Sequence, residues 1–165
     1  MTSYQADPET VATQSLSSEE MIDELIETAT SDDPVAVIQT VIASLEDDDT
    51  AMVSHTHEGH VWKFRYGSVE VFVQLTGLSD EDTLTVWSAV LQLPAKNELQ
   101  LMRKLMEMNW SRTFEACFGM FDDQVVVVAT RTLAGVSPGE ISRLITIVAT
   151  IADDNDEALQ AEFGQ

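Results

Sequence analysis

Basic residues are missing from the first third of the chain: no lysine or arginine precedes Lys63, although 14 of the 29 acidic residues do. The whole chain has 8 basic residues and a formal net charge of −21. Phosphate groups are bound by clustered lysine and arginine side chains, so this composition argues against a nucleic-acid ligand. The acidic charge repels anionic membranes, and it either attracts cationic partners or only keeps the domain in solution.

Cysteine and long apolar runs are also scarce. Cys117 is the single cysteine, which excludes an internal disulfide and favours a reducing compartment. The longest uncharged stretch, Thr83 to Ala95, is well below the roughly 20 residues that a membrane-spanning helix needs. No basic segment followed by an apolar run opens the sequence. We therefore expect an unprocessed cytoplasmic protein.

The length of 165 residues predicts one domain with a tail. Residues 1–16 show no helical or strand period and are expected to form a flexible acidic tail. A single α+β domain is expected over residues 17–160, with residues 17–30 as an additional acidic N-terminal helix. Ser17 and Glu20 match a capping box at the start of that helix.

The predicted helix at residues 17–30 has two contrasting faces. Its apolar positions recur at helical spacing: Met21, Ile22, Leu25, Ile26 and Ala29. Its other face is almost wholly acidic: Glu19, Glu20, Asp23, Glu24 and Glu27. A second helix is predicted from Pro34 to about Leu45, with Asp33 as its N-cap and the acidic run 46–49 after it.

Beyond Thr50 the apolar period changes from helical to alternating. Residues 62–66 and 69–75 predict two strands joined by a Gly67-Ser68 turn. Pairing Tyr66 with Val69 places the aromatic and apolar residues on one face and sets Arg65 opposite Glu70 on the other. A third, largely buried strand is predicted over residues 83–93, ended by Pro94.

The second half of the chain predicts a helix, a hairpin and a helix. A methionine-rich helix is expected from about residue 95 to 109, followed by strands at 114–118 and 124–133. Ser137, Pro138 and Glu140 form a capping signature for a last helix that fades into the acidic run 153–157. The predicted order is α-α-β-β-β-α-β-β-α, an α+β fold in which helices pack against an antiparallel sheet.

These elements resemble the YbjN-domain family, a family associated with bacterial sensory transduction. The resemblance rests on the helix from Leu99 through Met108-Asn109, the hairpin of residues 114–132, the capped helix at Ser137 and the closing Ala152-Asp153. The aromatic hairpin at 62–75 is similar to the family's N-terminal half. The resemblance covers about residues 34–156, and it implies a fold like that of the dimeric type III secretion chaperones. It also implies binding of a partner protein, a homodimer, no cofactor and no reaction.

The three histidines form the only metal-like cluster. His55, His57 and His60 surround Glu58-Gly59, and a turn there would bring three imidazoles together for a zinc or similar ion. The same residues also suit an exposed hairpin turn that binds nothing. A small-ligand or metal sensor that uses this cluster is therefore the alternative function.

No other constellation predicts chemistry. The run 153–157 has alternating ligand types for calcium, but Ala158 stands where an EF-hand loop needs glycine and Gly164 where it needs glutamate. Cys117 lies more than 50 residues from every histidine and is expected to be a buried, inert thiol. Ser137 is better explained as a helix cap than as a nucleophile. We therefore expect a protein that is not an enzyme.

Several large side chains are candidates for contact with a partner protein. Met102 and Met106 are expected in the core. Trp110 and Met108, at the end of the methionine-rich helix, and Phe72 and Trp87, on the sheet, are the predicted partner-binding residues. The sequence predicts a non-enzymatic, chaperone-like or regulatory module that holds a segment of an unidentified protein.

Overall fold

The strands form one sheet, and helices cover one of its faces. The computed structural model describes residues 33–46, 51–56 and 59–165. Helix α2 spans Pro34–Leu45, α3 spans Glu98–Ser111 and α4 spans Pro138–Phe163. The strands are β1 (Met52–Thr56), β2 (Gly59–Tyr66), β3 (Val69–Leu75), β4 (Thr83–Gln92), β5 (Cys117–Phe121) and β6 (Gln124–Thr132). The tail at 1–16 and the helix at 17–30 that the sequence predicts lie outside the described residues.

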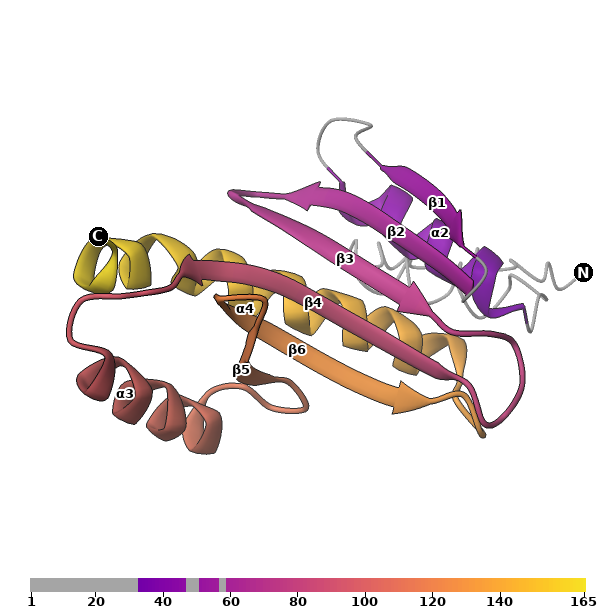
Figure 1. The fold of residues 1–165 in the computed structure, drawn as a ribbon. Helices are drawn as coiled ribbons and strands as arrows, with labels where there is room; N and C mark the ends of the chain where they lie inside the picture. Colours follow the sequence, from indigo (N-terminus) through magenta and orange to yellow (C-terminus); the bar gives the residue numbers. More distant parts are fainter. Residues whose placement is uncertain (1–32, 47–50, 57–58) are drawn as a thin grey trace, which may run out of the picture.

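All strands belong to one antiparallel sheet with the order β1-β2-β3-β4-β6-β5. Helix α2 packs on α4, and α4 packs on β2, β3, β4 and β6. In Figure 1 both helices lie behind the sheet, whose near face is open to the viewer. The α+β class predicted from the sequence is confirmed.

The hairpin of β2 and β3 has the register that the alternation predicts. Tyr66 pairs with Val69, Phe64 with Val71 and Trp62 with Val73. Phe64, Val71 and Val73 are fully buried on the face that α4 covers, whereas Arg65 and Glu70 are exposed on the other face. The burial of one complete face fixes this register, because a shift by one residue would turn every apolar side chain outward.

Strand β1 is absent from the predicted order, which has three strands before α3 where the structure has four. It pairs with β2 from Met52↔Lys63 to Thr56↔Gly59. The strand lies at the edge of the sheet and has no apolar alternation. The strand therefore forms because it hydrogen-bonds to the backbone of β2, and the periodicity of the sequence does not reveal such pairing.

Two helices begin where their caps predict. The Asp33 carboxylate accepts a hydrogen bond from the Val35 N–H at 3.0 Å, and Pro34 occupies the first turn of α2. Ser137 and Glu140 form a reciprocal capping box at the start of α4. The end of α4 differs from the prediction, because the helix continues through the acidic run to Phe163.

The capping box makes helix α4 sensitive to acid. The Ser137 N–H donates to Glu140 at 3.0 Å, and this bond, with nearby Arg131, lowers the pKa of Glu140 below its ordinary 4.5. The resulting stabilisation is complete above the unfolded pKa and is lost as the pH falls through the lowered folded pKa. We expect Glu140→Gln to melt below the wild type at pH 6 to 7 and the difference to shrink toward pH 3. Circular dichroism measures both melting temperatures at each pH. A difference between them that does not change with pH would contradict this expectation.

Candidate functional site

Helix α3 has apolar side chains on two opposite faces. Leu101 and Leu105 point inward and belong to the core. Leu99, Met106 and Trp110 are 80%, 69% and 93% exposed, and their spacing of seven and four residues places them along one outer stripe. Arg103 lies in the same stripe and is also exposed. We call these four residues, Leu99, Arg103, Met106 and Trp110, the α3 surface.

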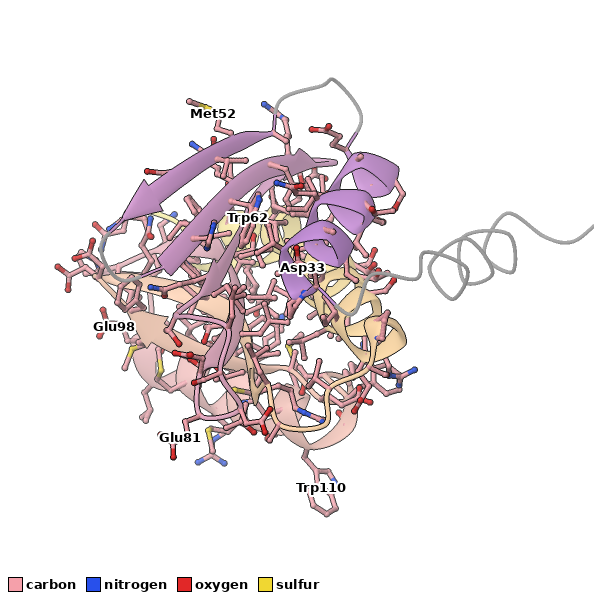
Figure 2. The ribbon with its side chains drawn as sticks, turned by 90° about the vertical axis from the view of Figure 1, so that its right-hand side faces the viewer. Asp33, Met52, Trp62, Glu81, Glu98 and Trp110 are labelled. Carbon is pink, nitrogen blue, oxygen red and sulfur yellow. The ribbon has the colours of Figure 1, made fainter. Side chains whose placement is uncertain are left out.

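Further exposed apolar side chains follow α3 in the sequence. Phe114 lies three residues after the end of the helix, and Met120 and Phe121 lie on β5, the strand that α3 contacts. In Figure 2 the Trp110 side chain projects away from the body of the molecule. Exposed apolar groups of this size concentrated on one element and its neighbour are typical of a protein-binding surface.

The amide of Asn109 joins the inner side of α3 to the edge of the sheet. Its oxygen accepts a hydrogen bond from the Phe118 N–H at 2.7 Å, and its nitrogen donates to the Phe118 carbonyl at 3.2 Å. Phe118 pairs with Val127 of β6 on its other side. Asn109 therefore satisfies the outward backbone groups of β5 at this position and holds α3 beside the edge strand.

The region around α3 is also the most basic part of the chain. Four of the 8 basic residues lie between Lys96 and Arg112, together with only two of the 29 acidic residues. Lys104 forms an ion pair with Glu162. Lys96, Arg103 and Arg112 form no ion pair with any residue that the structure describes. The surface therefore combines apolar side chains with unpaired positive charge in a strongly acidic protein.

The predicted partner-binding residues fall into two separate groups. Trp110 and Met108 lie on α3, where Trp110 is exposed and Met108 packs partly against the core. Phe72 on β3 and Trp87 on β4 stack with ring centroids 5.3 Å apart on the open face of the sheet. Strand β6 separates β4 from β5, so the structure does not bring the two groups together.

One methionine of α3 lies elsewhere than predicted. Met102 packs partly against the core, as expected, but Met106 is exposed and was predicted to be buried. Leu99 is exposed as well. The available signal is that the helix carries more apolar residues than the narrow stripe around Leu101 and Leu105 that the core needs.

The stacked pair on the open face is flanked by charged residues. Lys63 lies 5.6 Å from the centroid of the Phe72 ring and forms an ion pair with Glu70 at 2.7 Å. Phe72 and Trp87 are each half-buried, because each ring covers part of the other. The Phe72 and Trp87 rings are therefore largely covered by contacts within the chain, unlike the side chains of the stripe on α3.

The histidine cluster is described only in part. His55 and His60 are register partners in β1 and β2, as a hairpin turn at Glu58-Gly59 requires. The His60 ring stacks on Trp62 with centroids 5.4 Å apart. His57 and the side chain of His55 lie outside the described residues, so the metal-sensor alternative remains a prediction. Elsewhere in the described part of the chain, no group of three potential metal ligands occurs.

The structure also describes the predicted thiol, Cys117, and the acidic run at 153–157. Cys117 is exposed on β5, contrary to the expected buried thiol, because its neighbours Ala116 and Phe118 face the core and the side chain between them points to the opposite side. Phe114 has a φ of 50° and is not extended, and β5 begins only at Cys117. The acidic run at 153–157 is helical, and within it Asp153 and Asp156 accept hydrogen bonds from Ser68.

A shallow pocket lies between the first turns of α4 and the ends of β4 and β6. Its charged residues pair with one another: Arg131 with Glu140 at 2.7 Å, and Arg143 with Glu115 at 2.9 Å. The hydrogen bond from Arg143 lowers the pKa of Glu115, and Glu115 raises the pKa of Arg143. The charged side chains of the pocket are therefore paired with one another, an arrangement that does not resemble a catalytic centre.

The fold and its surfaces define an α+β domain with one sheet face covered by helices and an apolar, basic strip on helix α3. The chain belongs to the YbjN family, described as "Putative bacterial sensory transduction regulator", which matches residues 34–161. The family predicted from the sequence is confirmed. No curated protein sequence matches the chain. In the described residues, no helix is both long and apolar enough to cross a membrane.

One similar solved structure is the crystal structure of the ExsC–ExsE complex. It aligns with a TM-score of 0.47 and 17% sequence identity, and the alignment covers 78% of this chain and 97% of that chain.

Proposed function

We propose that this chain is a non-enzymatic, cytoplasmic protein-binding module of the regulatory or chaperone-like kind. It holds a segment of a partner protein on the α3 surface, and two copies associate as a homodimer. The observation that carries the proposal is the outward stripe of Leu99, Met106 and Trp110 on a helix whose opposite face is already packed into the core.

The energetics of that stripe favour a covered state. Burying one large apolar side chain contributes about 1.5–3 kcal/mol, so covering three of them gives several kcal/mol toward association. Aromatic residues and methionine are also enriched at protein interfaces. Met106 adds adaptability, because a thioether side chain repacks around partners of different shape.

The proposal predicts that capture of partner proteins depends on the α3 surface. The full chain is immobilised as the wild type, as Met106→Ser with Trp110→Ser, and as Leu78→Ser, an exposed apolar residue in the loop between β3 and β4. Proteins retained from native cytoplasm are quantified by mass spectrometry. We expect the α3 variant to lose at least about 90% of a specifically retained protein, because two of three apolar anchors are removed.

The control variant Leu78→Ser should retain that protein at the wild-type level. An α3 variant that retains it as well as the wild type does would contradict the proposed surface. Light scattering of the wild type supplies the second measurement, and a monomer at micromolar concentration would contradict the homodimer.

A further inference from the structure

The charge of the α3 surface restricts what can cover it. Pairing this surface with the same surface of a second copy would bring Arg103, near the middle of the stripe, close to Arg103 of the other copy, since a two-fold interface is self-complementary. Like charges in an interface are strongly unfavourable. The surface therefore fits an apolar segment that is acidic, such as an amphipathic helix with glutamates beside its apolar face.

The chain carries one segment with this chemistry. The sequence predicts a helix at residues 17–30, with five apolar and five acidic residues and no basic residue. Its length equals that of α3, 14 residues, which corresponds to about 21 Å of helix. Glu20 and Glu24 are four residues apart and border the apolar face beside Met21.

The connection to α2 shows which copy can supply the segment. Residue 30 is three Cα steps from Asp33, so it lies within about 11 Å of the start of α2. Helix α2 lies on the β1 side of the sheet and α3 beside β5, at the opposite edge, as both views show. The sheet between them has six strands about 4.8 Å apart. The connection does not carry residue 30 across the roughly 24 Å between β1 and β5. A segment aligned along α3 needs that end at the helix, so α3 of another copy is the one that it can cover along its length.

We propose that residues 17–30 of one copy bind the α3 surface of a second copy, and that the exchange is reciprocal. The apolar face of the segment covers Leu99, Met106 and Trp110, and its glutamates pair with Arg103 and with Arg112, which lies outside the α3 surface at the C-terminal end of the helix. This inference rests on the proposed function, because it names the occupant of the same surface. A partner protein with an acidic amphipathic segment then competes with the chain's own segment, and the dimer is the resting state of the binding site.

The test uses two full-length charge-reversal variants. One carries Arg103→Glu with Arg112→Glu, and the other carries Glu20→Lys with Glu24→Lys. In each variant alone, like charges oppose one another, and we expect the dimer dissociation constant to rise at least about tenfold. In an equimolar mixture each α3 surface meets a segment of opposite charge, and a mixed dimer of near wild-type affinity is expected. Sedimentation velocity measures both, and circular dichroism confirms that each variant is folded.

Only exchange between copies predicts rescue by mixing. A mixture that dissociates as readily as the single variants would overturn the proposal, as would a wild type that is monomeric at 50 μM, a concentration on the order of weak interface affinities. Failure of rescue while Met106→Ser with Trp110→Ser still loses its partner protein would overturn this inference alone. Rescue by mixing with no dependence of partner capture on α3 would support the exchange and contradict the proposed function.

Discussion

Replacement of Phe163 by alanine is expected to lower the free energy of unfolding by about 3–5 kcal/mol, the range for removing a buried aromatic ring. Phe163 is 1% exposed at the end of α4. The Lys104 ammonium lies 5.5 Å from the centroid of the Phe163 ring. The backbone carbonyl of Phe163 accepts a hydrogen bond from the Lys96 N–H at 2.8 Å. The ring therefore packs the end of α4 against the middle of α3, whereas the backbone bond to Lys96 remains in the alanine variant.

Urea denaturation followed by circular dichroism measures this change. The matched control is Phe114→Ala, the same substitution at a ring that is 82% exposed, for which a change below about 0.5 kcal/mol is expected. A loss below 1 kcal/mol for Phe163→Ala, or equal losses for both variants, would show that the end of α4 does not contribute to the core.

Gly67→Ala is expected to lower the free energy of unfolding by about 2–4 kcal/mol, because it combines backbone strain with the loss of a tertiary contact. Gly67 has a φ of 52°, and a Cβ atom there would clash with the Asp153 carboxylate. That carboxylate accepts hydrogen bonds from the Ser68 N–H at 2.7 Å and the Ser68 hydroxyl at 2.8 Å. An alanine must displace Asp153 and weaken the contact between the β2–β3 turn and α4.

Gly135→Ala separates the two causes. Gly135 also has a positive φ, 67°, but nothing lies within 4 Å of the position of its Cβ. This control should show only the strain of the left-handed conformation, about 1 kcal/mol. Thermal melts of the two variants that coincide would indicate that the Asp153 contact adds nothing to the stability of the turn.

The sequence predicts most of the fold where a signal is local. Asp33, Ser137 and Glu140 start their helices because capping depends on residues within one turn. The β2–β3 register follows from an alternation that a single turn fixes. The end of α4 was missed because its acidic run suggests a solvated terminus, whereas Asp156 turns inward and accepts a hydrogen bond from Ser68, 88 residues away.

The candidate site was predicted less completely, for a related reason. Periodicity shows that α3 is apolar, but not which of its apolar residues the core requires. Trp110 was correctly expected at the surface, whereas Met106 was assigned to the interior. Cys117 was also assigned to the interior, but it lies between Ala116 and Phe118, which face the core, and therefore points outward. Both errors concern which face of an element the core covers.

The Asn109 amide, finally, limits the kind of assembly this protein can form. Head-to-tail joining of sheets requires two open edges, β1 of one molecule and β5 of the next, and repeats without end into a filament. A side chain from α3 already occupies the backbone groups of Phe118 that such a neighbour would need. This position of the β5 edge is therefore closed to strand addition, which disfavours growth of a filament through β5.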